Sequence, residues 1–389
     1  MNARALRIFL FCCPIGLGCN DHDITKSRDV SEEPVEPPAD TEPFSTDWGQ
    51  WLSMDVTPKG EPIITFYDRD QGGIGFGLGT MTGTSVEWSF EGVDGYPDSS
   101  GLDAGDRGLY TSVVAAPDGT IWTSFYDQGA KNLRYGKRHP TLKAWTTGIA
   151  DMGDGPSQNA GLFSSIAMGA DGNPVIAHHD AGKGTLRVAR WNGINFVGSV
   201  FDRGEARVIE DTGSEVEEVE ANVGQFVQLK VFDGVEYMAY YDAANGDLKM
   251  AIGNEIHVVD SEGDVGAWPD FVVKGEDIHI TYQDKGNQQL KYAKGTPGAW
   301  EITVVDEAPY TGADTALYLE ESLQVVYFEG RSNDMKLAKL DGTSWTKSVI
   351  SSEGAVGFHN EVVTIAGKPY VACYNYTRRD VQFAPLGEP

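Results

Sequence analysis

The sequence contains little cysteine. It has four cysteines in 389 residues, and three of them fall within the first nineteen. Only Cys373 remains in the long part that follows, so the folded region cannot be a small scaffold held by disulfides. Cys373 stands in an apolar run, where we expect a buried side chain rather than a reactive thiol, because a low thiol pKa needs cationic or helix-end surroundings. A large hydrophobic core must therefore stabilise the fold.

Basic residues are also scarce. There are 30 Lys and Arg against 58 Asp and Glu, a formal net charge of -28, which becomes -30 once residues 1–19 with Arg4 and Arg7 are removed. Such an acidic chain is repelled by phosphate backbones and by anionic lipid surfaces. This argues strongly against nucleic acid or an anionic membrane surface as a partner, and it favours cations, basic proteins or neutral glycans.

Long hydrophobic runs are missing, apart from residues 8–17. That run is too short to span a bilayer, but behind Arg4 and Arg7 it suits the core of a signal peptide. Its end, Gly16-Leu17-Gly18-Cys19, resembles the lipobox of bacterial lipoproteins, although Gly16 stands where that motif has a Leu-like residue. The resemblance implies that Cys19 is acylated and becomes the mature N-terminus. An ordinary secretory signal is the alternative.

Residues 20–47 are rich in proline and acid and lack the apolar content of a folded segment. Prolines and like charges keep such a chain extended. We therefore predict a lipoprotein signal peptide at 1–19, an acidic linker at 20–47 and a folded domain at 48–386. This organisation places the protein in the bacterial cell envelope, attached to a membrane, which we expect to be the outer one, only through the N-terminal lipid.

A short strand-like motif recurs seven times in the folded region. Each copy is a β-rich run that ends in an aromatic pair and an acid, or in replacements for them, and a turn and a second short strand follow. The seven copies occupy residues 63–68, 122–127, 175–180, 237–242, 278–284, 323–329 and 370–375.

The spacing of the copies indicates the architecture. Successive copies end 59, 53, 62, 42, 45 and 46 residues apart, and the three shortest spacings fall in the range of about 40 to 50 that is typical of propeller blades. No stretch has a helical period. One blade cannot cover both its faces alone, so we predict an all-β, seven-bladed β-propeller of four-stranded antiparallel blades. The last unit stops after its third strand, and we expect residues 43–48 to supply the missing strand and close the ring.

A second pattern lies near the predicted channel mouth. In five units a Gly followed by a large residue comes just before the inner strand, and the large residues are Tyr110, Phe163, Phe226, Trp268 and Phe358. The Gly permits the turn. The aromatic residues either pack at the top of each blade or form a ring of platforms for sugar faces or partner side chains.

The Asp that ends five of the copies is expected to accept backbone N–H groups in the turn that follows, because a catalytic residue is needed once or twice and not five times. Copies that depart from the pattern are better candidates for a ligand site. The departures and the basic residues near them are His178, His179, Glu329, Arg331, Arg378 and Arg379. His178 and His179 are adjacent in a strand and point to opposite faces, so they do not share one metal. The simpler role for each is that of a hydrogen-bonded core histidine.

An acidic insertion between the first two units offers hard oxygen ligands to Ca²⁺. Its candidate ligands are Asp94, Asp98, Asp103 and Asp106. They do not fit the twelve-residue calcium loop, so a solvated acidic loop is the alternative, and no cofactor is assigned.

The units resemble the superfamily of exported bacterial β-propellers that includes sialidase-like and glycan-binding members. The stretch Ala115-Ala116-Pro117-Asp118-Gly119-Thr120-Ile121-Trp122 is similar to part of the sialidase Asp-box, Ser-x-Asp-x-Gly-x-Thr-Trp, but it lacks the Ser and has Pro at the first Asp. No arginine triad of the sialidase kind can be assigned. The resemblance implies a propeller that binds glycans or acts on them.

Two functions remain open. One is a lipid-anchored binding or scaffold module, monomeric or part of an envelope complex, that engages an envelope protein or a glycan at the propeller mouth. The other is a glycoside hydrolase or lyase that would use paired carboxylates, or His179 with a nearby arginine. The sequence has no nucleophile motif, phosphate-binding loop or metal-ligand spacing, which favours the binding module, although a fold alone decides neither.

Overall fold

The computed structural model describes residues 46–96, 105–155, 158–210 and 216–386. The predicted signal peptide, Cys19 and nearly all of the predicted linker lie outside the described residues. All strands belong to the compact unit Glu36–Pro389. The described residues contain no helix that could cross a membrane.

The chain builds seven antiparallel sheets in succession, and each sheet is one blade. Blade 1 consists of β1 (Trp48–Val56), β2 (Pro62–Asp68), β3 (Gly73–Thr82) and β4 (Ser85–Asp94). Blade 2 consists of β5 (Arg107–Ala115), β6 (Ile121–Asp127), β7 (Asn132–Arg138) and β8 (Trp145–Asp151). Blade 3 consists of β9 (Ala160–Met168), β10 (Pro174–Asp180), β11 (Thr185–Trp191) and β12 (Phe196–Asp202).

The remaining four blades follow the same order. Blade 4 consists of β15 (Val223–Phe232), β16 (Val235–Asp242), β17 (Asp247–Ile252) and β18 (Glu255–Asp260). Blade 5 consists of β19 (Val265–Lys274), β20 (Asp277–Asp284), β21 (Gln289–Thr296) and β22 (Ala299–Asp306). Blade 6 consists of β23 (Thr311–Leu319), β24 (Leu323–Glu329), β25 (Asp334–Asp341) and β26 (Ser344–Ser351), and blade 7 of β27 (Val356–Ile365), β28 (Lys368–Asn375) and β29 (Asp380–Pro385).

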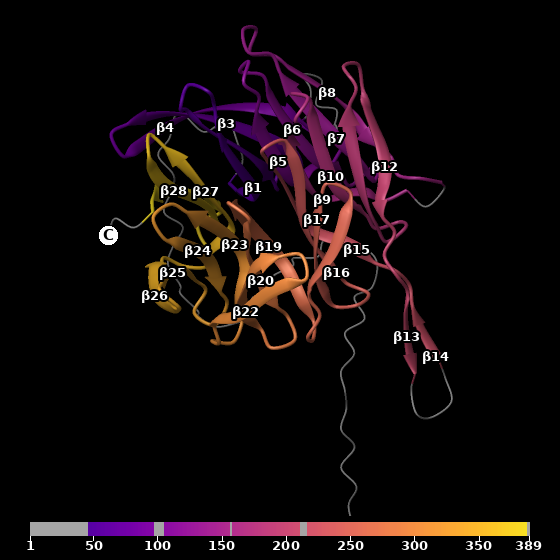
Figure 1. Cartoon of the computed structure of the whole chain (residues 1–389). Coiled ribbons are helices and arrows are strands. Elements are labelled where there is room, and N and C mark those ends of the chain that lie inside the picture. The colour runs from indigo at the N-terminus through magenta and orange to yellow at the C-terminus, as the bar shows by residue number, and fades with distance from the viewer. Residues whose placement is uncertain (1–45, 97–104, 156–157, 211–215, 387–389) are drawn as a thin grey trace, which may run out of the picture. The chain divides into compact units, whose positions relative to one another are not determined.

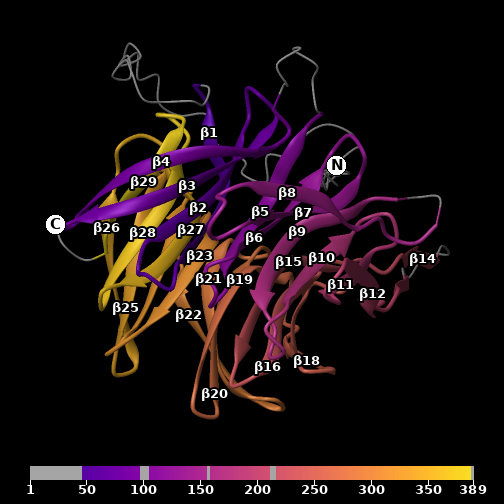
Figure 2. The ribbon, with the colours of Figure 1, turned by 90° about the horizontal axis from the view of Figure 1, so that it is seen from above.

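The blades are arranged in a ring (Figures 1 and 2). The first strands of neighbouring blades contact one another all the way round, from β1 through β5, β9, β15, β19, β23 and β27 back to β1. These seven first strands therefore line a central channel. The predicted seven-bladed propeller is confirmed. An additional hairpin of β13 (Arg207–Glu210) and β14 (Val216–Val219) is inserted between blades 3 and 4 and extends beyond the blades (Figure 1).

The predicted closing strand is not seen. Among the described residues β29 has no partner other than β28, residues 43–45 lie outside that part of the chain, and Trp48 begins β1 of blade 1. Blades 7 and 1 meet instead through packed faces, where β1 and β27 lie side by side (Figure 1), and through a backbone hydrogen bond from Trp48 N–H to the Arg379 carbonyl at 3.1 Å. Tyr374 Oη donates a 2.6 Å hydrogen bond to Asp47 Oδ1 across this junction.

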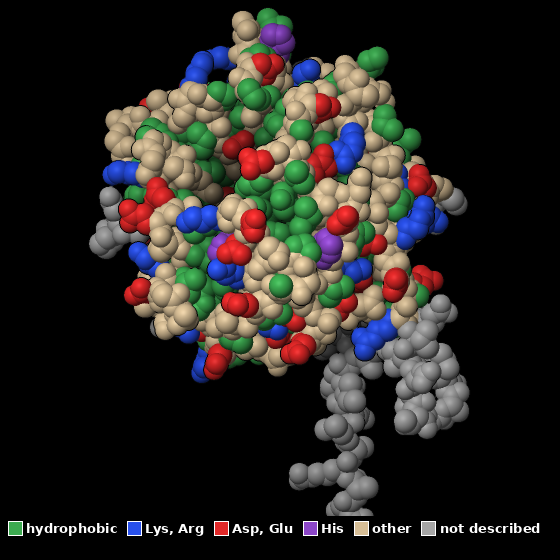
Figure 3. Space-filling model, in the orientation of Figure 1, with side chains coloured by type: hydrophobic (Ala, Val, Ile, Leu, Met, Phe, Trp, Pro, Cys, Tyr) green, Lys and Arg blue, Asp and Glu red, His purple; other side chains and the backbone are tan. Residues whose placement is uncertain are grey.

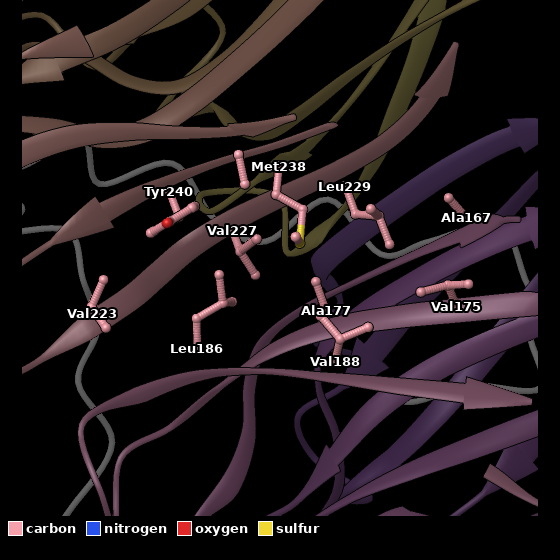
Figure 4. Close-up of a cluster of buried hydrophobic side chains, with 11 residues drawn as sticks. Ala167, Val175, Ala177, Leu186, Val188, Val223, Val227, Leu229, Met238 and Tyr240 are labelled. Carbon is pink, nitrogen blue, oxygen red and sulfur yellow. The ribbon is translucent and has the colours of Figure 1, made fainter. Parts of the chain in front are cut away.

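The hydrophobic core lies between blades rather than within one. Figure 4 shows the cluster between blades 3 and 4, in which Val175 and Val188 from one blade meet Leu229 and Met238 from the next. Every residue of β2, β6 and β10 is buried, because each blade is covered on both faces. This explains why the motif strands have no simple alternation of polar and apolar residues.

The recurrent motif connects each blade to both neighbours. Its second aromatic position bonds forward: Tyr67 Oη donates to Asp106 at 2.8 Å and Tyr241 Oη to Asp264 at 2.5 Å, both just before the next blade. Its first aromatic position bonds backward: Tyr282 Oη donates to Asp260 at 2.6 Å, at the end of the preceding blade. Adjacent side chains of a strand point to opposite faces, so one pair reaches two neighbours.

The terminal acid of the motif has the structural role that was expected. Asp127 Oδ1 accepts the backbone N–H of Ala130 at 2.8 Å, and Asp284 Oδ1 accepts that of Asn287 at 2.9 Å. The replacements do the same: Glu329 accepts the N–H of Arg331, and Asn375 Oδ1 accepts the N–H of Arg378. These side chains stabilise the turn after the second strand of each blade.

Candidate functional site

Every first strand carries the same double irregularity near its start. In blade 1 the pairs Trp48 with Asp68, Gln50 with Tyr67, and Ser53 with Thr65 are separated by two register shifts. The shifts coincide with a Gly at positive φ and, two residues later, a non-glycine residue at positive φ. In β1 these are Gly49 at 113° and Trp51 at 53°. A β-bulge of this kind redirects a side chain.

The bulged position forms a ring round the channel, which we call the collar. Its seven residues, one from each blade, are Trp51, Tyr110, Phe163, Phe226, Trp268, Asp314 and His359, with φ between 46° and 54°. A bulky residue in the left-handed region costs about 1 to 2 kcal/mol. Because all seven blades carry it, the bulge belongs to the architecture. The type of side chain at this position, in contrast, differs from blade to blade.

The collar side chains contact one another in sequence. Ring centroids lie 4.1 Å apart for Trp51 and Tyr110, 4.7 Å for Tyr110 and Phe163, and 4.5 Å for Phe226 and Trp268. The Phe163 and Phe226 centroids are also 4.5 Å apart, with the planes tilted by 49°. At these distances the rings pack against each other, so they form a continuous apolar rim rather than separate platforms.

Two blades interrupt the aromatic rim. Blade 6 supplies Asp314 and blade 7 supplies His359, and His359 Nδ1 lies 3.6 Å from Asp314 Oδ1. The His359 ring also packs against Trp51 at 4.8 Å. The collar thus combines five aromatic residues with one carboxylate and one imidazole.

In three blades the residue after the collar position bonds to the backbone of the preceding collar residue. Ser164 Oγ donates to the carbonyl of Tyr110 at 2.7 Å, and Thr315 Oγ1 donates to that of Trp268 at 2.9 Å. Asn360 Nδ2 donates to the carbonyl of Asp314 at 2.8 Å. These bonds join neighbouring blades, so the collar is rigidly positioned.

A cavity of about 130 Å³ lies on the channel axis, since all seven first strands line it. Below the collar its walls carry hydroxyl and amide groups, from Ser53, Ser112, Ser165 and Gln228 among others, and the carboxyl group of Glu361. Its lining, which belongs entirely to the described residues, contains no Lys or Arg.

Glu361 is the unusual group of this cavity. Its carboxyl group has no hydrogen bond or ion pair with any of the residues that the structure describes. Burial is the main cause that raises the pKa of Glu361 to about 8, and repulsion from Asp270 and Asp55 adds to it, while Lys230 acts in the opposite direction. Glu361 is therefore mostly protonated at neutral pH in the empty channel.

The structure brings together four of the five aromatic residues predicted at the mouth. Tyr110, Phe163, Phe226 and Trp268 are all collar residues. Phe358 is not: it is only 2% exposed and packs on Phe328 at 4.4 Å. The collar residue of blade 7 is the next one, His359.

Sequence reasoning missed Trp51, Asp314 and His359. All three stand two residues after a Gly, as in Gly49-Gln50-Trp51 and Gly312-Ala313-Asp314. Counting a fixed distance from the Gly would have found them, whereas searching for a large residue did not.

The predicted histidines lie between blades rather than at the mouth. His178 is fully buried, and its Nε2 is 3.2 Å from Asp151 Oδ2 of blade 2. His179 Nδ1 is 3.0 Å from the carbonyl of Val223 in blade 4. Burial lowers the pKa of His179 to about 4, so this ring is neutral.

The other predicted residues are placed as follows. Glu329 is buried in its turn, while Arg331, Arg378 and Arg379 are exposed in the turns after the second strands and do not line the cavity. The calcium candidates are split: Asp98 and Asp103 lie outside the described residues, and Asp106 accepts the Tyr67 hydroxyl.

Asp94 forms ion pairs with two arginines. It lies 2.8 Å from both Arg107 and Arg134. Within the described residues no group of three or more His, Cys, Asp or Glu could hold a metal ion. Cys373 is buried, and burial raises the pKa of its thiol to about 12, which agrees with an unreactive side chain.

Comparisons with known proteins support the fold. No protein-family model and no curated protein matches the sequence. Among solved structures, the polysaccharide lyase Uly1 superposes with a TM-score of 0.52 at 12% identity, covering 93% of this chain and 94% of that one. Virginiamycin B lyase from Staphylococcus aureus superposes with a TM-score of 0.51 at 12% identity, covering 87% and 94%.

These similarities are too low in identity to extend beyond architecture. They show that the chain folds as a β-propeller of the kind found in these lyases, with a resemblance at the level of the fold.

Proposed function

We propose that the protein is a binding module of the bacterial cell envelope, anchored through a lipid on Cys19, that engages a protein or a glycan at the mouth of its channel. The observation that carries this proposal is the collar. Five blades direct an aromatic side chain to one ring around the cavity, and the side chain at this position, unlike the bulge, is not set by the architecture.

The chemistry of the collar supports binding. Partly exposed aromatic residues in a concave, rigid setting are typical of recognition sites, and a few polar groups among them give orientation. Here Asp314 and His359 interrupt the rim and Glu361 lies below it. The acidic net charge of the chain excludes polyanionic partners.

The proposal is tested with the purified mature protein on glycan arrays and against fractionated envelope proteins. Trp268→Ala should weaken binding of the recognised ligand at least about tenfold, as loss of a central aromatic contact does. Trp345→Ala is the matched control, because Trp345 packs on Tyr292 in the outer part of blades 5 and 6. A ligand that binds both variants as well as it binds the wild type places recognition elsewhere and overturns the proposal.

A second function is favoured by one observation, the His359–Asp314 pair. An imidazole beside a carboxylate can act as a general base, and Uly1 shows that a propeller of this kind can be a polysaccharide lyase. Incubating the protein with acidic and neutral polysaccharides and following product release tests it. Release that His359→Gln abolishes establishes an enzyme, and no release from any substrate leaves the binding module.

A further inference from the structure

We propose that the collar and the cavity beneath it accept an alkylammonium group, with its carbon chain in the aromatic rim and its charged end at Glu361. This inference rests on the proposed binding function and specifies the ligand. A lysine side chain of a partner protein and a free diamine both carry this group, and the experiment below distinguishes them.

The volume of the cavity limits the size of the ligand group that it can hold. It measures about 130 Å³, close to the roughly 150 Å³ of an engineered protein cavity that binds benzene. It therefore holds a group of about six heavy atoms. A single side chain fits this space, whereas a chain of sugars could only lie outside it.

The charges of the channel favour a cation. Asp314 and Glu361 line the cavity, and no Lys or Arg does among the residues described. The cation that comes nearest, Lys230, is already neutralised, since its Nζ lies 2.6 Å from Asp270 Oδ1 and donates to the Phe271 carbonyl at 2.9 Å. The Glu361 carboxyl group is left without a partner, surrounded by hydroxyl and amide groups that can accept N–H donors.

The collar suits the carbon chain of such a ligand. Five apolar rings surround the axis, and a circle of seven positions with the observed spacing of 4.1 to 4.8 Å is about 10 Å across. A cation on its way to Glu361 passes about 5 Å from each ring centre, within the roughly 6 Å over which aromatic rings attract cations. Once the charge has passed, methylene groups contact the rings.

Binding is coupled to a proton. Because the pKa of Glu361 is about 8 in the empty channel, the ammonium group must displace the proton of the carboxyl group below that pH. The charged groups that act on Glu361 are Asp270 from β19, Lys230 from β15 and Asp55 from β1, with Asp314 and His359 in the collar above it. Affinity should rise roughly 50-fold from pH 6 to pH 8 and then level off, since the ammonium group itself stays charged to about pH 10.

The test is calorimetric titration of the full-length mature protein with butylammonium, with 1-butanol as the uncharged isostere. Butylammonium should bind and 1-butanol should not. In Glu361→Gln the affinity for butylammonium should fall at least about tenfold and should no longer depend on pH. A pH dependence that survives in Glu361→Gln would assign it to His359. Equal binding of the two probes, or wild-type affinity in Glu361→Gln, overturns the inference.

A second variant guards against misfolding of the first. Gln228→Lys places a tethered ammonium group in the same cavity and leaves Glu361 in place, so it should block butylammonium. Thermal unfolding shows whether each variant is folded, and butylammonium binding unchanged in a folded Gln228→Lys also contradicts the inference.

Two further comparisons distinguish a protein partner from a free diamine, and the proposed function from the present inference. A lysine-containing peptide that binds more tightly than 1,4-diaminobutane indicates a protein partner, and the reverse order indicates a free diamine. If a glycan or protein binds in a Trp268-dependent manner while butylammonium does not bind, the proposed function stands and this inference fails.

Discussion

Single polar residues connect the blades. At five junctions an Asp at the end of one blade receives a cationic side chain from the third strand of the next: Arg134 reaches Asp94, Arg187 reaches Asp151, and Lys291 reaches Asp260. These groups are largely buried, so each carboxylate is stable only because it is paired and hydrogen-bonded. Each of these pairs therefore helps to hold two neighbouring blades together.

Asp151 provides the sharpest test of these pairs. It is 8% exposed, and it contacts Arg187, which is 2% exposed, and His178. Asp151→Ala removes the acceptor of His178 Nε2 and the buried acceptor of Arg187, which keeps only the exposed Asp154, so the free energy of unfolding should fall by about 3 to 5 kcal/mol. Urea denaturation measures this change.

The matched control is Asp154→Ala. Asp154 also contacts Arg187, at 2.6 Å, but its side chain is 69% exposed, so its loss should cost less than about 1 kcal/mol. Similar effects of the two substitutions would contradict the importance of the buried pair.

Asp151 also has a predictable pH dependence. Burial alone would raise its pKa, but hydrogen bonds from His178 and Arg187 outweigh burial and lower the pKa below 3.8. A carboxyl group whose pKa is lowered on folding stabilises the protein above its unfolded pKa, and that contribution is lost as the pH falls through the folded pKa. Acidification should therefore reduce the difference in the free energy of unfolding between the wild type and Asp151→Ala.

At the scale of the strand, the important device is the bulge that carries the collar. Its Gly is required sterically as well as conformationally. Gly266 has φ of 107°, and a Cβ there would meet Leu248 Cα at 2.6 Å. The bulge brings β19 against the third strand of the preceding blade, so a glycine in each first strand permits both the collar and the close contact between blades.

Gly266→Ala should therefore destabilise the protein more than its φ alone explains. Gly263→Ala is the control, because Gly263 has φ of 101° and nothing within 4 Å of the new Cβ. Both substitutions place a Cβ on a left-handed backbone, but only Gly266→Ala adds a clash with backbone. We therefore expect its free energy of unfolding to fall by about 1 to 3 kcal/mol more. Equal unfolding midpoints for the two variants would show that Leu248 and its surroundings adjust to the new Cβ without a loss of stability.

The sequence patterns predicted strands and turns well and the collar only in part. The motif ends and the turn-stabilising Asp residues are local features, set by side chains within three residues of the backbone groups they bind. The collar depends on a bulge, which shifts the register by one residue and changes the side chain that faces the channel. In blade 7 a large residue, Phe358, directly follows the Gly, but the bulge directs the next residue, His359, to the channel.

At the scale of the whole molecule, the question is how the ring is held where its ends meet. Blades 1 and 7 pack Leu52, Ile64 and Phe66 against Ala372 and Val363, and Tyr374 Oη bonds to the buried Asp47 at 2.6 Å. In the described residues the two blades share no sheet, so this junction depends on side-chain contacts and on one backbone hydrogen bond, from Trp48 N–H to the Arg379 carbonyl at 3.1 Å.

Tyr374→Phe should consequently lower the stability of the entire propeller. A hydrogen bond to a charged acceptor contributes about 1.5 to 3 kcal/mol, and its loss should shift the single thermal transition to lower temperature. Tyr376→Phe is the control, since Tyr376 is 36% exposed and its hydroxyl has no hydrogen bond in the described part of the chain. An unchanged midpoint in Tyr374→Phe would mean that apolar packing and the Trp48–Arg379 backbone bond close the ring without the Tyr374 hydroxyl.

The amino-acid sequence by itself determined the number of blades, the all-β class and the role of the repeated Asp, because the repeat period and the turn chemistry can be read from short stretches of the chain. Only the tertiary structure decided which side chains meet. It directed His178 and His179 to opposite neighbours and brought residues from all seven blades to one axis. There it placed Glu361 in the cavity with no hydrogen bond or ion pair to the described residues, because ring closure joins positions that are hundreds of residues apart.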